Sequence, residues 1–269
     1  MNNETNDEIL VSTAAGIATI TLNRPDRMNT ISRTMLHDLG QALLRADDDP
    51  EVRVVVLTGT GRAFCAGLDV RSAVSGDGIG SQNDADSART TLDLKTAPPT
   101  ILFNMDTPTI CALNGSAAGY GMDLALGCDI RVMAHSAKFA AAFVKRGIVP
   151  ESGGTWFLPR MIGWAKAAEV IFTGRTLTAE QSLALGLANE IVPDNALPGR
   201  AQELAAEIAT NAPLAVQAAK RMMRAGLSEP FGEHVHHVFL QLLPLFRTQD
   251  FREGLQSFLE KRPANFKGR

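Results

Sequence analysis

The chain has 269 residues, of which 45% are hydrophobic, so it can form one large domain with a sizeable core. Its net charge of −3 gives no electrostatic case for binding nucleic acid or an anionic membrane surface. No apolar run approaches the roughly 20 residues that a membrane-spanning helix needs.

The first 58 residues predict a hairpin, a helix and a buried strand. Residues 1–8 are polar and acidic, unlike a secretory or transit peptide, and the three cysteines form no CxxC pair, so we expect a cytoplasmic protein. Residues 9–12 and 17–22 flank a small turn and predict two paired strands. An amphipathic helix is expected over residues 31–46, and the β-branched residues 52–58 predict a strand that is covered on both faces.

A glycine-rich loop follows that strand. Residues 59–70 contain neither Gly-Lys-Ser/Thr nor GxGxxG, so they lack the residues that a phosphate-binding loop requires. What remains is a close-approach loop, in which Ala66 and Gly67 are small residues beside exposed backbone amides. Cys65 has no histidine near it in sequence, which favours a packing thiol over a nucleophile.

A second glycine turn lies beyond a polar segment. Residues 71–90 are polar and rich in glycine, which predicts a mobile segment suited to covering a pocket. A helix is expected over residues 91–104, broken near its paired prolines, and a buried strand over residues 108–113. Residues 114–129 then cross a run of small residues into a helix. Its free amides favour an anionic oxygen, and Asp123 lies in its first turn.

A third glycine turn carries a second carboxylate. After a strand over residues 129–134, the apolar residues 138–144 are suited to lining a cavity. The turn at residues 147–155 leads into a helix and contains Glu151. A carboxylate at a helix start often only satisfies the helix amides, worth about 0.3–1 kcal/mol, so spacing alone assigns neither acid a catalytic role.

From residue 197 onward the pattern becomes purely helical. We therefore predict a core at residues 1–196 and a helical region at residues 197–269, which is expected to carry oligomer contacts. His234 and His237 are one helical turn apart, but nothing near them in sequence completes a set of metal ligands. We expect no metal site.

Four segments resemble the signatures of the enoyl-CoA hydratase/isomerase (crotonase) superfamily, in matching order and spacing. These segments are residues 61–69, 114–125, 147–155 and 257–266. Residues 150–160 and 250–255 are similar to the epoxyphenylacetyl-CoA isomerase type within it. The resemblance implies an α/β fold, a crotonase-like spiral of ββα units with a C-terminal helical oligomerisation region, assembled as a homotrimer or a dimer of trimers.

The resemblance also implies a substrate and a site. The substrate would be an acyl-CoA thioester, with coenzyme A as part of the substrate and no separate cofactor. By position, the amides of Ala66 and Tyr120 would form an oxyanion hole for the thioester oxygen. The residues expected to contact coenzyme A are Arg24, Ala66, Leu68 and Asp69, with Phe258 and Lys261 reaching it from a neighbouring subunit.

Two positions depart from the family's efficient hydratases, which carry two glutamates. Asp123 stands at the first position and Phe143 at the second, so we expect the site for the attacking water to be lost. Glu151 matches a position where several isomerases of the superfamily have their acid or base, and an apolar cavity would raise its pKa. We therefore predict double-bond or ring isomerisation through a dienolate, with Glu151 as proton shuttle and Asp123 as helper or second acid.

Other outcomes stay open. Hydration of a 2-enoyl-CoA to a 3-hydroxyacyl-CoA by Asp123 and Glu151 is the main alternative. Acyl-CoA hydrolase or C–C lyase chemistry remains, because this fold hosts many outcomes on one enolate. So does a non-catalytic acyl-CoA or RNA binder, although the net charge of −3 and the single tyrosine give RNA little support. The acyl pocket is expected between residues 72–103, residues 140–143 and the helix near Trp156.

Overall fold

A computed structural model describes residues 8–69, 71, 74 and 96–269 of the chain. Most of the segment predicted to cover a pocket, at residues 71–90, therefore lies outside the described residues. The same holds for residues 91–95 of the predicted helix over residues 91–104.

The larger sheet contains the predicted hairpin and the apolar strands. Its strands are β1 (Ile9–Ala14), β2 (Ile17–Leu22), β3 (Val54–Gly59), β5 (Thr109–Leu113), β7 (Ile130–Ala134) and β10 (Glu190–Val192), which lie in that spatial order. β1 pairs antiparallel with β2, and every other pair in this sheet is parallel. Parallel strands need covering on both faces, which explains the almost continuous burial of β3 and β5.

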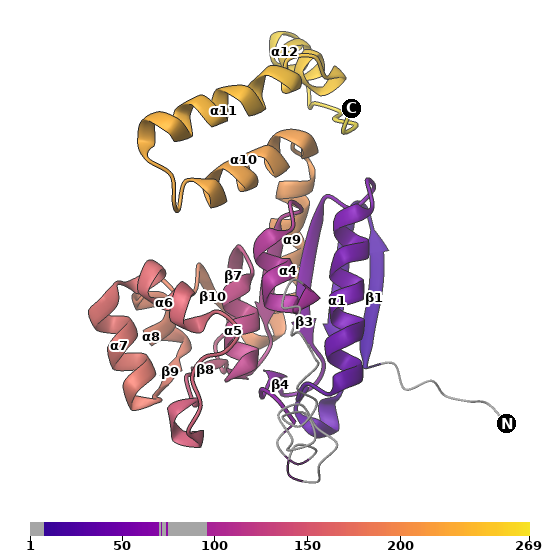
Figure 1. Cartoon of the computed structure of the whole chain (residues 1–269). Coiled ribbons are helices and arrows are strands. Elements are labelled where there is room, and N and C mark those ends of the chain that lie inside the picture. The colour runs from indigo at the N-terminus through magenta and orange to yellow at the C-terminus, as the bar shows by residue number, and fades with distance from the viewer. Residues whose placement is uncertain (1–7, 70, 72–73, 75–95) are drawn as a thin grey trace, which may run out of the picture.

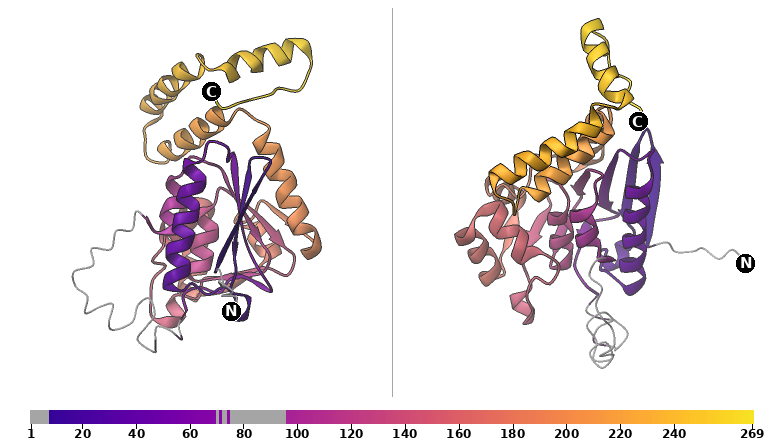
Figure 2. Two further views of the ribbon diagram at one scale, coloured as in Figure 1. Left: turned by 90° about the vertical axis from the view of Figure 1, so that its right-hand side faces the viewer. Right: turned by 45° about the horizontal axis from the view of Figure 1, so that its top comes forward.

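Helices cover both faces of this sheet (Figure 2). On one face, α1 (Arg33–Asp48) begins at Ser32, whose Oγ accepts a hydrogen bond from the Met35 N–H (2.9 Å). Beside it lies α4 (Pro98–Asn104), in which the paired prolines form the first turn. On the other face lies α9 (Leu197–Ala209).

A smaller sheet, which the sequence analysis missed, sets the glycine turns side by side. It consists of β4 (Ala63–Cys65), β6 (Ser116–Ala118), β8 (Lys138–Ala140) and β9 (Thr176–Thr178) in that order. β4, β6 and β8 are parallel to one another, so the turns that follow them open at the same edge of the sheet. Next to this edge lie α5 (Tyr120–Gly127) and α6 (Gly154–Ile162).

The remaining elements include α7 and α8 on the left side of the core in Figure 1 and the helical region above it. They are η1 (Pro25–Arg27), η3 (Val144–Arg146), α7 (Trp164–Thr173), α8 (Ala179–Ala184), η4 (Asp194–Ala196), α10 (Pro213–Ala225), α11 (Phe231–Leu245) and α12 (Gln249–Glu260). None of the described helices is long and apolar enough to span a membrane.

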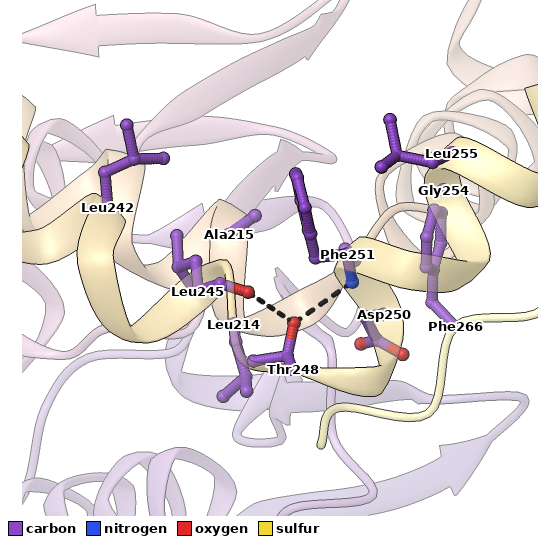
Figure 3. Close-up of a pocket in the computed structure, with 11 residues that line it drawn as sticks. Leu214, Ala215, Leu242, Leu245, Thr248, Asp250, Phe251, Gly254, Leu255 and Phe266 are labelled. Carbon is purple, nitrogen blue, oxygen red and sulfur yellow. Dashed lines mark hydrogen bonds between the residues drawn. The ribbon is translucent and has the colours of Figure 1, made fainter.

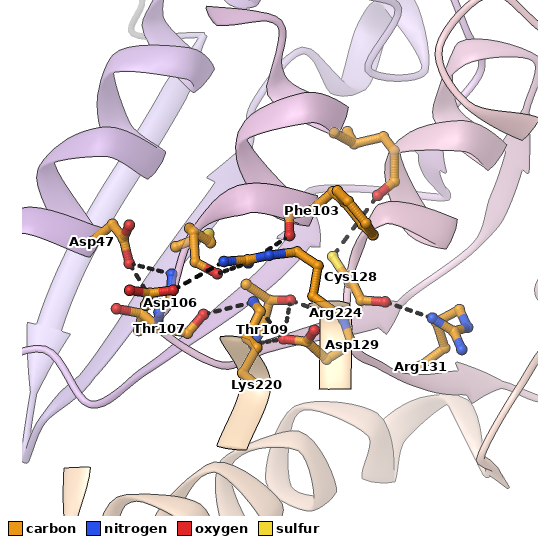
Figure 4. Close-up of polar contacts among 12 residues, drawn as sticks. Asp47, Phe103, Asp106, Thr107, Thr109, Cys128, Asp129, Arg131, Lys220 and Arg224 are labelled. Atoms are coloured by element: carbon orange, nitrogen blue, oxygen red, sulfur yellow. Dashed lines mark hydrogen bonds and ion pairs between the residues drawn. The ribbon is translucent and has the colours of Figure 1, made fainter. Parts of the chain in front are cut away.

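The predicted boundary between residues 196 and 197 falls too early. It leaves α9 outside the core, but Leu197, Ala201 and Ala205 of that helix are buried against the sheet. The helices that stand apart from the sheets begin with α10. Charged contacts join this helix to the core (Figure 4): Lys220 pairs with Asp129 at 2.8 Å, and Arg224 pairs with Asp106 at 3.1 Å.

Candidate active site

The turns after β4 and β6 meet at the start of α5. Gly67 has a φ of +97°, and a Cβ there would lie 2.9 Å from the carbonyl oxygen of Ala118 and 3.7 Å from the Tyr120 nitrogen. A Cβ at Gly121 would overlap the carbonyl oxygen of Cys65. Only glycine allows the two turns to approach so closely, and their backbone amides are thereby brought to one place.

Two backbone amides are free at this junction. Tyr120 begins α5, and within the described part of the chain its N–H has no acceptor. The carbonyl of Gly67 accepts a hydrogen bond from the Ile31 N–H (2.8 Å). In a trans peptide the C=O and N–H point in opposite directions, so the Leu68 N–H is turned away from Ile31, and it too has no acceptor among the described residues.

The predicted role of Ala66 as an oxyanion-hole donor is contradicted. The Ala66 N–H already donates to the carbonyl oxygen of Met28 at 3.0 Å. A committed amide cannot also bind a thioester oxygen without breaking that bond, which costs about 1–3 kcal/mol if the Met28 oxygen is left unpaired. The free amide next to Tyr120 is therefore that of Leu68, two residues further along.

Asp123 is buried in the first turn of α5, and its carboxyl group lies at the start of α6. Its Oδ2 accepts a hydrogen bond from the Ser152 N–H (3.2 Å). Its Oδ1 lies against Gly154 and has no hydrogen-bond partner among the described residues. Burial raises the pKa of Asp123 to about 7, with a smaller contribution from nearby Glu151, against the lowering effect of the Gly154 and Ser152 amides.

Glu151 directly precedes Ser152, whose N–H donates a hydrogen bond to the Asp123 carboxyl group. It lies at the edge of a cavity of about 300 Å³ between α4 and α6, which we call the front cavity. The walls of this cavity include Pro99, Phe103, Trp156 and Phe157. Partial desolvation raises the pKa of the Glu151 carboxyl above its usual range. A raised pKa makes the carboxylate a stronger base, which suits a group that takes up and releases a proton.

Phe143 and Cys65 limit which reactions the site can catalyse. Phe143 is buried, and its ring lies 3.9 Å from where a Cβ of Gly119 would be, directly at the turn before α5. An apolar ring therefore packs against the turn that leads into α5. Cys65 is fully buried, and burial raises the pKa of its thiol to about 12, so it is not a nucleophile at neutral pH.

The structure brings the predicted coenzyme A residues of the core together. Ile31 forms a bridge with Leu68, which places the loop after β2 beside the loop after β4. Arg24 spans the two loops: its guanidinium pairs with Asp69 at 3.3 Å and with Glu8 at 2.9 Å. In this arrangement Arg24 holds the loops in place, and contact of these residues with coenzyme A stays a prediction.

Phe258 and Lys261 lie elsewhere. They are at the end of α12, at the opposite end of the molecule from β4 (Figure 1). Within one chain they cannot take part in the site. The Phe258 side chain is 82% exposed, as a residue that contacts a neighbouring subunit would be in an isolated chain.

Metal-ligating side chains do not cluster in the described part of the chain. His234 and His237 both lie 3.0 Å from Glu229, through their Nδ1 atoms. No group of three or more His, Cys, Asp or Glu that could hold a metal ion is found among the described residues. These histidines and the glutamate instead link α11 to the turn that precedes it.

Comparisons with known proteins extend over nearly the whole chain. A family model described as enoyl-CoA hydratase/isomerase matches residues 12–269. The chain is 39% identical over 255 residues to a probable enoyl-CoA hydratase of Rhodobacter capsulatus, with 94% of this chain and 95% of that protein covered. It is 36% identical over 268 residues to the 1,2-epoxyphenylacetyl-CoA isomerase of Escherichia coli, with 97% and 98% covered. The crystal structure of an enoyl-CoA hydratase from Bacillus anthracis matches with a TM-score of 0.90 at 34% identity, covering 98% of this chain and 100% of that one.

Proposed function

The chain belongs to the enoyl-CoA hydratase/isomerase family of acyl-CoA enzymes, and from this premise we propose that it isomerises an enoyl-CoA through a dienolate. The observation that carries the proposal is the placement of Glu151, a carboxyl group with a raised pKa at an apolar cavity. Phe143 supports it, because this buried phenyl ring stands at the sequence position of the second glutamate of the family's hydratases and offers no hydrogen bond to hold an attacking water.

The proposed reaction moves one proton between two carbons. The ionised Glu151 removes a proton from the α carbon of a 3-enoyl thioester, and the electron pair of the broken C–H bond delocalises onto the thioester oxygen. The amides of Tyr120 and Leu68 stabilise the resulting negative charge. Glu151 then returns the proton to the γ carbon, which gives the 2-enoyl thioester and restores the carboxylate.

Deuterium wash-in at the α and γ carbons of an enoyl-CoA tests this role. In D₂O, the wild-type enzyme should exchange both positions. Glu151→Gln keeps the side-chain shape but cannot shuttle a proton, so exchange should fall by about 10²–10⁴-fold, the usual contribution of general acid–base catalysis. Glu207→Gln, at an exposed position of α9, is the matched control. Unchanged exchange in Glu151→Gln would refute the assignment.

Hydration is the second candidate. Two carboxyl groups with raised pKa, Asp123 and Glu151, lie close enough to influence each other, and such a pair could move protons to and from a water molecule. The hydratase names among the relatives also favour it. Fast addition of water to crotonyl-CoA, lost in both Asp123→Asn and Glu151→Gln, would support hydration over isomerisation.

We extend the proposal to the substrate, the cofactor requirement and the location of the enzyme. The substrate is an acyl-CoA thioester that brings coenzyme A with it, and we propose that no separate cofactor takes part. A cytoplasmic location remains a proposal based on the reduced cysteines and the composition.

A homotrimer or a dimer of trimers is proposed from the exposed apolar side chains of the helical region. Phe231, Phe258 and Leu259 are between 79% and 83% exposed. Figure 3 shows a further apolar hollow of about 350 Å³ between α10, α11 and α12, with Leu242, Leu255 and Phe266 in its walls. Exposed apolar surface of this extent on a folded chain indicates an interface.

Sedimentation velocity tests the assembly. The wild-type protein should sediment as a trimer or hexamer, and the double variant Phe258→Asp/Leu259→Asp should shift toward the monomer. Phe172→Asp is the control, because Phe172 is 71% exposed on α7, away from these helices. A monomeric wild-type protein would refute the proposal.

A further inference from the structure

Behind the front cavity lies a second, larger one. It has a volume of about 540 Å³, and we call it the rear cavity. It extends from α4 and α6 to α9 and α10, and its lining includes Leu126, Ile208, Val216 and Met223. The front and rear cavities share three lining residues, Phe103, Trp156 and Phe157.

These three aromatic side chains form a wall between the cavities. The ring centroids of Phe103 and Trp156 are 5.0 Å apart, those of Phe103 and Phe157 5.9 Å, and those of Trp156 and Phe157 5.3 Å. All three pairs meet edge to face, at interplanar angles from 66° to 88°. Each ring thus packs against the other two in the edge-to-face geometry that aromatic pairs favour.

The wall is held in place from both sides. Phe103 is on α4, near its end, and the backbone oxygen of Phe103 accepts a hydrogen bond from Arg224 at 2.9 Å (Figure 4). The Arg160 guanidinium carbon lies 4.0 Å from the centroid of the Trp156 ring. Trp156 is also in the first turn of α6, five residues after Glu151, so its distance from the proton-transfer group is fixed by a short, folded segment.

The rear cavity suits an apolar group. Most of its lining side chains are aliphatic or aromatic. Of its three cations, Lys220 and Arg224 are paired with Asp129 and Asp106, respectively, as Figure 4 shows. The third, Arg160, stacks on the Trp156 ring and donates to the Trp156 backbone oxygen at 3.2 Å. A hydrocarbon chain would therefore fit this space better than a phosphate or a carboxylate, which would have to compete with those ion pairs.

We propose that the aromatic wall of Phe103, Trp156 and Phe157 limits the length of the acyl group. The inference rests on the proposed function, because it assigns the front cavity to the acyl group of the thioester. At about 30 Å³ for each water-sized group, the front cavity of about 300 Å³ holds roughly ten non-hydrogen atoms. The enzyme then accepts a short or single-ring acyl group, and longer chains reach the rear cavity only when the wall is opened.

Binding of saturated acyl-CoAs tests the wall without requiring catalysis. Dissociation constants of butanoyl-, octanoyl- and dodecanoyl-CoA are measured by calorimetry on the full chain. With the wild-type protein, affinity should rise from butanoyl to octanoyl and then rise no further. In Trp156→Ala, dodecanoyl-CoA should bind at least tenfold more tightly than octanoyl-CoA, because each newly buried methylene can contribute up to about fourfold.

Further variants distinguish a failure of the aromatic wall from a failure of the proposed function. Phe103→Ala opens the same wall from α4 and should act in the same direction, and a gain in affinity cannot arise from a misfolded chain. Trp164→Ala is the matched control, because Trp164 is 76% exposed on α7. If wild-type affinity keeps rising through dodecanoyl-CoA, or if neither wall variant gains, the inference is wrong while the proposed function stands. If no acyl-CoA binds the wild-type protein, the proposed function fails as well.

Discussion

Burial of the Asp123 carboxyl group should make the stability of the fold depend on pH. Its pKa rises from the ordinary 3.8 to about 7, because the group is buried at 0% exposure. At 1.36 kcal/mol per pH unit, this difference corresponds to roughly 4 kcal/mol of stability at full ionisation. Below pH 3.8 both folded and unfolded chains hold the proton, and Asp123 contributes no pH dependence.

Between the two pKa values the unfolded chain loses its proton while the folded chain keeps it. Stability therefore falls as pH rises, and it levels off above about pH 7, where the folded chain also ionises. Between pH 5 and pH 8 the loss from this one group is roughly 2–3 kcal/mol. Asp123→Asn removes the titration. Any cost of placing an amide at the unpartnered Oδ1 position is the same at every pH, so it displaces the curve without changing its slope.

Urea denaturation of the wild-type protein and Asp123→Asn at pH 5, 6, 7 and 8 measures the effect. The difference in unfolding free energy, variant minus wild type, should increase by roughly 2–3 kcal/mol across this range. Asp48→Asn, at an exposed position of α1, is the control and should follow the wild-type curve. Parallel curves for the wild-type protein and Asp123→Asn would refute the reasoning.

Three further substitutions test the site. Tyr120→Phe removes a buried hydroxyl group that has no partner among the described residues, so the unfolding free energy should stay unchanged or rise by up to about 1–3 kcal/mol; a fall in urea denaturation would reveal a missed partner. Gly121→Ala places a methyl group on the carbonyl oxygen of Cys65 and should destabilise the fold by about 1–3 kcal/mol or more, seen as a lower thermal midpoint; an unchanged midpoint would show that the turns can separate. Phe143→Glu introduces a second carboxylate at the turn that leads into α5, so the ratio of crotonyl-CoA hydration to isomerisation should rise at least tenfold; an unchanged ratio would show that Phe143 does not decide the outcome.

The larger sheet was predictable because its signals are local. The alternating residues of β2, the β-branched run of β3 and the apolar face of α1 each specify their element within a few residues, and all three were predicted. The α/β fold and the family resemblance are confirmed by the matches to known proteins. The smaller sheet was missed, because strands of three residues such as β4 and β6 are too short to show a period of two.

The error at Ala66 has a non-local cause. Sequence position located the right loop, but the choice between neighbouring amides depends on which backbone oxygen each one faces. The Ala66 N–H faces Met28, which lies 38 positions earlier in the chain, and no local pattern reports that contact. The aromatic wall is a similar case, because Phe103 and Trp156 come from different helices whose packing fixes the ring angles.

In the proposed mechanism, Asp123 and Glu151 have different roles. Asp123 accepts the Ser152 N–H and lies against Gly154, so its short side chain holds the turn that carries Glu151. A buried carboxyl group fixed in this way, which is not among the residues that line the front cavity, is suited to positioning. Glu151 itself lines the cavity, where a group that transfers a proton between two carbons of one substrate must lie. Addition of water would need a second polar group to hold the water molecule, and Phe143, at the sequence position of the second glutamate of the family's hydratases, offers none. The arrangement therefore supports proton transfer between carbons over the addition of water.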